Sequence, residues 1–274
     1  MSLDKIMMNE EKKGVISLLG VTGGIGKILA EGLKKNEYIV VGNGRRENVL
    51  ADMKNKGKID DYVVGDLTED SDREKIIEKI IEYVNKGYKV SVFYNIGILY
   101  DYRGDISKYS IKEIRKAWQT NLEGIMALDI GLLNKKLILD TIYMVSISAH
   151  YVGGWDPIYQ ITKAALDRYV AALKYDDEVN NRKRRLIALS PDTIKTGEEG
   201  MGSKLEDYPK IPGELFVRKV VEIINGKYKE YSEFIFEIGK DRRIRLYGMN
   251  PSKDRNIFDY HEKIFIEEIG EAVY

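Results

Sequence analysis

A tyrosine and a lysine stand four residues apart in the segment 157–165, which reads PIYQITKAA. On a helix, positions i and i+4 lie one turn apart on the same face, so Tyr159 and Lys163 can point into one cleft. A nearby cation favours the ionised form of a phenol, and lowering a tyrosine pKa from about 10 by three units takes roughly 4 kcal/mol. The pair could therefore transfer a proton, and Ser146 precedes Tyr159 by thirteen residues.

A glycine-rich turn, residues 20–26, lies upstream and reads GVTGGIG. It follows an apolar run and opens a stretch of helical period, the context in which backbone N–H groups and a helix N-terminus face a pyrophosphate. Glycine permits positive φ and close approach of the backbone there. The spacing Gly-x-x-x-Gly-x-Gly differs from the common Gly-x-Gly-x-x-Gly fingerprint, and any tight strand-to-helix turn can recruit glycines. Taken alone, the turn leaves both interpretations open.

The elements that must position these residues follow from the alternation of short apolar, β-rich runs with longer stretches of helical period. This alternation is typical of a parallel sheet covered on both faces. Right-handed crossovers make such a sheet doubly wound, so we expect an α/β fold with about seven strands and helices on both faces. The expected strands are 15–19, 38–42, 61–64, 89–94, 139–145, 186–190 and 233–238, and the expected helices are 24–35, 47–56, 71–86, 110–133, 157–177 and 212–225.

Two segments do not follow this alternation. Residues 197–213 are rich in glycine and proline. A long loop of this kind could be a lid over the substrate site or a surface loop without a role in binding. The tail from 240 to 274 is charged and then aromatic-aliphatic, and it predicts a helix over 260–269. No linker-like stretch divides the chain, so we expect a single domain over 1–274 with an N-terminal extension at 1–13.

The composition favours small-molecule partners. Lys plus Arg and Asp plus Glu both number 44, so no net basic field would gather nucleic acid or an anionic membrane surface. There is no cysteine and only two histidines, His150 and His261, so we expect no disulfide, no thiolate chemistry and no metal site. Neither a signal-peptide core nor an apolar run of the roughly 20 residues that span a membrane is present, so a cytoplasmic enzyme is expected.

The ordered set of motifs resembles the short-chain dehydrogenases/reductases of the single-domain type, from about residue 15 to residue 196. The resemblance implies a Rossmann fold that binds NAD(P), and hydride transfer between the nicotinamide and a carbonyl or alcohol carbon. The matching positions, in chain order, are Gly20, Gly24, Gly26, Asp66, Asn95, Gly97, Asn121, Ser146, Tyr159, Lys163, Pro191 and Thr196.

The resemblance also implies a role for each catalytic position. Tyr159 is expected to be the general acid in reduction and the general base in oxidation. Lys163 would lower the pKa of Tyr159 and bind the nicotinamide ribose, and Ser146 would hydrogen-bond the substrate oxygen. Asn121 would hold a water that links Lys163 to solvent. The implied cofactor contacts are Gly20, Thr22, Gly24, Ile25, Gly26, Asp66, Leu67, Asn95, Ile96, Gly97, Tyr159, Lys163, Pro191, Ile194 and Thr196.

Some of these positions have competing interpretations. Asp66 could accept a hydrogen bond from the adenine amino group or simply cap a turn. Ser148 could replace the serine two residues earlier, although its spacing to the tyrosine disfavours it. His150, Tyr151 and Trp155 follow the same strand and could enter the substrate pocket, but a loop histidine with satisfied hydrogen bonds is the commoner case.

Three residues depart from the family pattern. Leu19 stands where a threonine is usual, and Tyr94 replaces the first asparagine of the Asn-Asn-Ala-Gly element. Asp192 replaces the glycine that usually follows the proline. The first two bear on local hydrogen bonding, whereas Asp192 lies by resemblance near the nicotinamide and could alter its pose or affinity.

The segment 40–47, which reads VVGNGRRE, bears on the choice of cofactor because no acidic residue ends the second expected strand. An Asp or Glu there would accept from the ribose 2′-OH of NAD and repel a phosphate. The guanidinium groups of Arg45 and Arg46 instead suit a 2′-phosphate. The sequence therefore favours NADP over NAD. A charged pair at the start of a surface helix can, however, also be solvent-exposed without binding any ligand.

Together these features predict an NADP-dependent oxidoreductase that acts on a small carbonyl or alcohol, and the resemblance adds a homodimer or homotetramer. The alternatives are a dinucleotide-sensing protein without turnover, an NAD-dependent dehydrogenase, and a nucleotide-sugar epimerase. Epimerases usually carry a larger C-terminal substrate domain than the segment after Pro191 provides. The sequence indicates neither the substrate nor the direction of the reaction.

Overall fold

The computed structural model describes residues 14–100, 102, 104–151, 156–196, 208–249 and 263–274. Its strands are β1 (Val15–Leu19), β2 (Ile39–Gly44), β3 (Asp61–Val64), β4 (Val90–Tyr94), β5 (Asp140–Met144), β6 (Leu186–Pro191), β7 (Ile194–Lys195), β8 (Ile211–Pro212), β9 (Glu233–Ile238), β10 (Arg243–Met249) and β11 (Ile264–Glu271). Its helices are α1 (Gly24–Lys35), α2 (Glu47–Asn55), α3 (Asp70–Asn85), α4 (Ile111–Trp118), α5 (Gly124–Asn134), α6 (Pro157–Val179) and α7 (Gly213–Ile224). The short helical turns are η1 (Ile106–Lys108), η2 (Gln119–Glu123) and η3 (Ile147–Ala149).

The strands form one nine-stranded sheet of order β11-β10-β9-β6-β5-β4-β1-β2-β3, and β7 and β8 form a separate pair. From β3 to β9 all neighbours are parallel, whereas β10 and β11 are antiparallel. The predicted doubly wound α/β fold is therefore confirmed, with more strands than the expected seven. Among the described residues, no helix is both long and apolar enough to cross a membrane.

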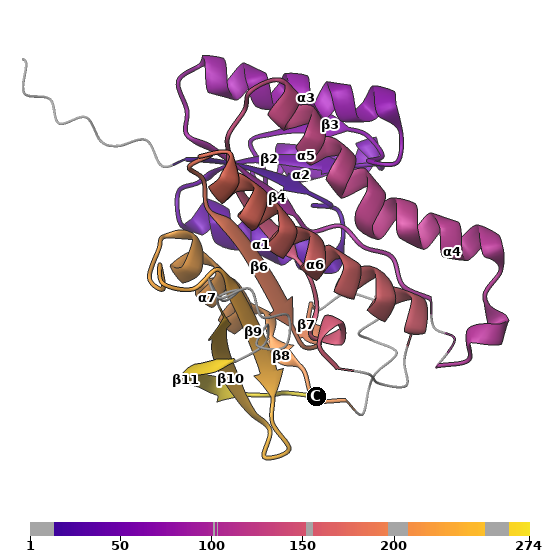
Figure 1. The fold of residues 1–274 in the computed structure, drawn as a ribbon. Helices are drawn as coiled ribbons and strands as arrows, with labels where there is room; N and C mark the ends of the chain where they lie inside the picture. The colour runs from indigo at the N-terminus through magenta and orange to yellow at the C-terminus, as the bar shows by residue number, and fades with distance from the viewer. Residues whose placement is uncertain (1–13, 101, 103, 152–155, 197–207, 250–262) are drawn as a thin grey trace, which may run out of the picture.

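Helices cover both faces of the sheet (Figure 1). Leu29 of α1 and Phe216 of α7 pack in a core on one face, and Ile76 of α3 and Leu166 of α6 pack in a core on the other. Strand β1 alternates between the two cores: Ile16 and Leu18 face the first, and Val15 and Leu19 face the second. Leu19, the first of the three residues that differ from the family pattern, is thus part of the core. Its burial explains why an apolar residue stands at that position.

The prediction of a helix over residues 260–269 is wrong in the described part of that segment. Residues 264–271 form β11, which pairs antiparallel with β10 and extends the sheet beyond β9. An open sheet edge supplies unpaired backbone groups that a strand can satisfy and a helix cannot. Because this edge is far away in sequence, the local pattern of the tail could not reveal it. Most of the predicted lid lies outside the described residues, and its last part forms β8 against β7.

The second departure, Tyr94, lies in a buried tyrosine–aspartate cluster. The hydroxyls of Tyr94 and Tyr143 each donate to Asp129 at 2.7 Å, and Tyr169 donates to it at 3.0 Å. Asp129 is fully buried, and burial raises the pKa of its carboxyl despite the three phenol donors. A tyrosine at this position therefore contributes to an internal hydrogen-bond network instead of leaving a gap in it.

Removing the acceptor of this network should destabilise the protein. Asp129→Ala should lower the free energy of unfolding by about 2–4 kcal/mol, because it leaves two buried phenols and the partly buried phenol of Tyr169 without their acceptor. Tyr169→Phe, which removes one donor, should cost only about 1 kcal/mol. Urea unfolding of the two variants measures both values, and equal losses would contradict a network centred on Asp129.

Candidate active site

Three of the four residues predicted to carry the chemistry meet at a cavity of about 820 Å³. Ser146 follows β5, Tyr159 and Lys163 project from α6, and all three line the cavity. The segments that follow β1, β4 and β6 also line it. The cavity thus lies at the carboxyl ends of the central parallel strands, where ligands bind in open α/β sheets.

Helix α6 begins at a cap that also fixes the tyrosine. Asp156 is the N-cap: its Oδ1 accepts from the backbone N–H of Tyr159 at 2.7 Å, and Pro157 occupies the first turn. Asp156 is 2% exposed and also accepts from the hydroxyl of Tyr109 and the backbone N–H of Tyr100. The first turn of α6 is therefore tied to the segment after β4. An Asp-Pro pair before a helical stretch is a capping signal that the sequence already contained.

Burial governs the pKa of Tyr159, the predicted acid–base group, in this structure. Burial raises the pKa of Tyr159 to about 12, although a hydrogen bond with Ser146 acts in the opposite direction. Ser146 itself caps η3, where its hydroxyl accepts from the backbone N–H of Ser148 at 3.1 Å. At neutral pH the phenol is therefore protonated and can donate.

Lys163 does not produce the expected lowering of the tyrosine pKa here. Its Nζ lies 5.6 Å from the centre of the Tyr159 ring and donates to the carbonyls of Met144 at 2.7 Å and Ile96 at 3.3 Å. Lys163 is 1% exposed, and burial lowers its pKa to about 7. Burial is the sole cause of this shift, and no carboxylate among the described residues opposes it. Near neutral pH the amine is therefore charged only part of the time, which weakens its effect on the phenol.

Asn121 occupies a five-residue π-helix, η2, between α4 and α5. Its Oδ1 accepts from the backbone N–H of Ile98 at 2.7 Å, and its Nδ2 donates to the Ile98 carbonyl and to Thr162 Oγ1, both at 2.9 Å. A π-bulge inside a helix often marks a functional site. Asn121 is fully buried and ties the segment after β4 to the residue beside Lys163. Its predicted role in holding a water stays a prediction.

The glycine turn requires glycine at its contact points. Gly20 has φ of 79°, and a Cβ there would lie 2.4 Å from the carbonyl oxygen of Asn95. A Cβ on Gly26 would lie 2.3 Å from the Gly20 carbonyl, and one on Gly24 would lie 2.8 Å from Thr196 Oγ1. The turn after β1 therefore packs directly against the segments after β4 and β6, as a shared ligand site requires.

The N-terminus of α1 fits the pyrophosphate of a dinucleotide. No side chain caps this helix among the described residues, and its first turn has no acidic residue. Gly23, Gly24 and Ile25, the residues at the start of the helix, line the cavity. Uncapped backbone N–H groups and the positive end of the helix dipole would both face an anion there.

The residues predicted for the adenosine end lie at the surface. Arg45 is 65% exposed in its side chain and approaches Asp66 Oδ2 at 3.5 Å, and Arg46 donates to the Thr22 carbonyl at 2.7 Å. Asp66 accepts from both the backbone N–H and the hydroxyl of Thr68, at 3.0 and 2.9 Å. Asp66 therefore has the turn-capping contacts that the sequence left as an alternative to adenine binding.

The described cavity brings together many of the predicted site residues and omits others. Those that line it are Gly24, Ile25, Asn95, Ile96, Gly97, Ser146, Tyr159, Lys163, Pro191, Ile194 and Thr196. Those outside its lining are Gly20, Thr22, Gly26, Arg45, Arg46, Asp66, Leu67 and Asn121, of which Leu67 is a buried core residue.

Polar residues that the motifs do not identify also line the cavity. Tyr208 and Glu237 are two of them, and Tyr151, considered only as a neighbour of the serine, is a third. Asp192, the third family departure, lines the cavity as well; burial raises the pKa of its carboxyl, and it accepts from the backbone N–H of Thr193 at 2.7 Å. Glu237 and Tyr151 are joined through Lys263, whose Nζ contacts both. No local sequence signal links these residues.

His150 and Trp155 were considered as further residues of the substrate pocket. His150 is absent from the described lining of the cavity and instead contacts Ser190 Oγ at 3.1 Å. Trp155 and His261 lie outside the described residues.

A doubly wound sheet with a glycine turn and a serine, a tyrosine and a lysine around one cavity is the arrangement of a nicotinamide-dependent oxidoreductase. The family model for short chain dehydrogenases matches residues 14–204, and the chain belongs to this family. No curated protein sequence matches the chain.

Solved structures agree with this assignment at the level of the fold. The chain is similar to a short-chain dehydrogenase from Streptomyces avermitilis, at 17% identity and a TM-score of 0.68 over 82% of this chain and 88% of the other. It is similar to a short chain dehydrogenase from Bacillus anthracis, at 19% identity and a TM-score of 0.68 over 82% and 95%. It is also similar to L-sorbose reductase from Gluconobacter frateurii complexed with NADPH and L-sorbose, at 20% identity and a TM-score of 0.64 over 77% and 89%.

Proposed function

We propose that this protein is an NADP-dependent oxidoreductase that interconverts a carbonyl and an alcohol, with Tyr159 as its general acid and base. The observation that carries the proposal is the convergence of Ser146, Tyr159 and Lys163 on a cavity that reaches the uncapped start of α1. The NADPH bound by L-sorbose reductase, a protein of similar fold, supports the choice of cofactor.

In this proposal the residues of the chain handle the proton and the developing charge. NADPH supplies the hydride when it is bound. The phenol of Tyr159, with a pKa of about 12, donates its proton to the substrate oxygen. Ser146 donates a hydrogen bond to the same oxygen and stabilises its negative charge. Near neutral pH a phenol with this pKa is protonated, which is the form that acts as the acid in reduction.

Lys163 has a supporting role in this scheme. With a pKa of about 7 it can gain and lose a proton at neutral pH, so a charged Lys163 can assist the phenolate that forms when Tyr159 donates. By resemblance to the family, Lys163 also binds the nicotinamide ribose. Asn121 holds the segment around Ile98 against Thr162, next to Lys163, and so keeps the lysine in place.

The proposal is tested by following NADPH absorbance with a panel of aldehydes, ketones and sugars. We expect turnover of at least one carbonyl class, with NADPH preferred to NADH. NADPH binding without turnover across the panel would favour the dinucleotide-sensing alternative. Turnover with NADH alone would favour the NAD-dependent dehydrogenase.

Removing the two arginines after β2 should weaken the binding of NADPH much more than the binding of NADH. Arg45→Ala combined with Arg46→Ala should raise the Kd for NADPH about 10- to 100-fold and the Kd for NADH less than about threefold, because only NADPH carries the 2′-phosphate. Fluorescence titration with both cofactors measures the change. The matched control is Arg243→Ala combined with Arg245→Ala on β10, which removes equal charge near the other edge of the sheet. An equal effect on both cofactors would contradict the phosphate assignment.

We also propose that the chain forms one domain, works in the cytoplasm and assembles as a homodimer or homotetramer. The support is the family resemblance, since these folds commonly associate through the helices that carry Asn121 and Tyr159. Light scattering coupled to gel filtration determines the assembly, and a monomer at micromolar concentration would exclude it.

A further inference from the structure

A second polar cluster lies apart from the active-site cavity, formed by His150, Asp167 and Glu233. One ligand atom from each of these residues lies within 4.8 Å of the other two. His150 follows η3, Asp167 lies on α6 one turn beyond Lys163, and Glu233 is the first residue of β9. The fold thus places an imidazole and two carboxylates from three separate elements around one point.

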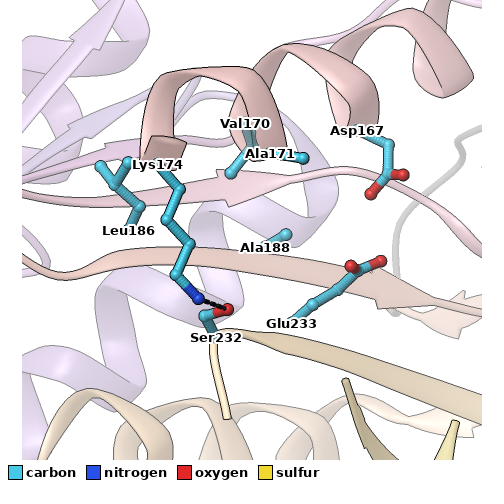
Figure 2. A pocket seen from close by; sticks show the side chains of 8 residues that line it. All are labelled: Asp167, Val170, Ala171, Lys174, Leu186, Ala188, Ser232 and Glu233. Atoms are coloured by element: carbon cyan, nitrogen blue, oxygen red, sulfur yellow. Dashed lines mark hydrogen bonds between the residues drawn. The ribbon is translucent and has the colours of Figure 1, made fainter. Parts of the chain in front are cut away.

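The two carboxylates of this cluster point toward one another in the interior (Figure 2). Asp167 and Glu233 are each 6% exposed. Burial, followed by the proximity of Asp167, raises the pKa of Glu233 to about 9. Glu233 Oε1 is buried and makes no hydrogen bond among the described residues, although His150 Nε2 lies 3.3 Å from it. Two buried carboxylates side by side are unfavourable unless a proton or a metal cation compensates their charge.

Lys174 lies close enough to Glu233 for the two charges to interact, but its hydrogen bond goes to Ser232. Its Nζ donates to Ser232 Oγ at 2.6 Å, on the side of the cluster away from Asp167 (Figure 2). Burial lowers the pKa of Lys174, so its charge is itself disfavoured at this place. Lys174, Ser232 and the two carboxylates line a cavity of about 10 Å³.

The distances within the cluster match those between the ligands of a tetrahedral metal ion. His150 Nε2 lies 3.3 Å from Glu233 Oε1 and 3.1 Å from Ser190 Oγ. Metal–ligand bonds of about 2.0 Å place neighbouring tetrahedral ligands about 3.3 Å apart. All three ligand atoms lie within 4.8 Å of one another, so the longest separation must shorten by up to about 1.5 Å to complete the set. An imidazole nitrogen with carboxylate oxygens is a ligand set suited to Zn²⁺.

We propose that His150, Asp167 and Glu233 bind one divalent metal ion, Zn²⁺ being the expected ion, with a water or the Ser190 hydroxyl in the fourth position. The positive charge of the metal compensates the two buried carboxylates. None of the three ligands lines the described active-site cavity, so the metal does not touch the substrate.

The role of this metal is to position the catalytic segment. Ser146 caps η3, and α6 carries Tyr159 and Lys163, so a metal bound between η3, α6 and β9 would hold the serine in place relative to α6. The expectation of no metal site rested on the absence of cysteine and the scarcity of histidine. A site that uses one histidine and two carboxylates distant in sequence is not excluded by either count.

The test is zinc binding to the tag-free full chain after treatment with EDTA and gel filtration into metal-free buffer. Calorimetric titration with ZnCl₂ and elemental analysis should show one equivalent per chain. Zinc in excess should raise Tm by about 5 °C or more. Glu233→Gln and Asp167→Asn should each weaken zinc binding by at least about 100-fold. The matched control Glu178→Gln, an exposed acid on the same helix, should bind zinc like the wild type.

Two outcomes would overturn the site. If the wild-type chain binds less than one equivalent and its Tm is unchanged by zinc, the three residues do not form a metal site. If Glu233→Gln binds zinc as tightly as the wild type, the metal lies elsewhere. Anomalous scattering at the zinc edge from wild-type crystals decides the location even if a variant fails to fold. A peak between His150 and Glu233 supports the site, and a peak in another place contradicts it.

Discussion

Tyr159→Phe should lower kcat by about 10³-fold or more and leave the Kd for NADPH within about threefold of the wild type. The substitution removes only the phenol oxygen, and a positioned general acid contributes about 10²- to 10⁴-fold. In the proposed reduction this oxygen delivers the proton to the substrate, and Ser146 can hydrogen-bond the substrate but has no proton of suitable acidity to replace it. Stopped-flow and steady-state NADPH absorbance, with fluorescence titration for binding, measure both values.

A matched substitution on the same helix is the control for this result. Tyr175→Phe removes an exposed phenol of α6 and should leave kcat within about twofold. Turnover that persists in Tyr159→Phe would exclude the assigned acid–base role. A fall in kcat accompanied by an equal loss of NADPH affinity would instead indicate a collapsed cavity.

Lys163→Met should abolish turnover and yet raise the free energy of unfolding at pH 7 by about 1–3 kcal/mol. The lysine is 1% exposed, and burial lowers its pKa from 10.5 to about 7. Holding this amine in the folded interior costs roughly 4 kcal/mol at neutral pH, because each pKa unit corresponds to about 1.4 kcal/mol. Loss of the hydrogen bonds to the Met144 and Ile96 carbonyls offsets about 1–2 kcal/mol of the gain. A stability cost of this kind is expected of a residue kept for function.

The pH dependence identifies the cause of this stabilisation. The unfolded chain keeps this lysine protonated up to about pH 10.5, and the folded chain releases the proton near pH 7, so the unfolded state binds more protons between these values. Wild-type stability therefore gains from this group as pH rises from 7 to 10.5, and the advantage of Lys163→Met shrinks over the same range. Urea unfolding of both proteins at pH 7, 8 and 9 measures the difference.

An exposed lysine serves as the reference for this experiment. Lys183→Met should change stability little and by the same amount at each pH, because Lys183 is exposed in the folded chain. A Lys163→Met variant that is less stable than the wild type at every pH would show that the folded protein stabilises the charged form of the lysine. That result would contradict a lowered pKa for Lys163.

The local features of this protein were determined by its sequence. The alternation of apolar runs with helical periods predicted the seven strands from β1 to β9 of the large sheet and the helices that cover it, because periodicity depends on residues a few positions apart. The spacing of Tyr159 and Lys163 placed them on one face of α6, and the glycines after β1 predicted a turn that needs Gly20 at positive φ. Parallel strands then brought these separate motifs together at their carboxyl ends.

Other features were decided only by the tertiary structure. The tail is a strand because the edge of β10 pairs with it, and this partner lies outside any local window. The pKa directions of Tyr159 and Lys163 follow burial, which every element around the cavity determines together. The cluster of His150, Asp167 and Glu233 joins residues that no sequence motif connects. Spacing along the chain thus determined which side chains share a turn or a helix face, whereas burial and contacts between distant segments determined their charge and their partners, because those depend on the whole packed chain.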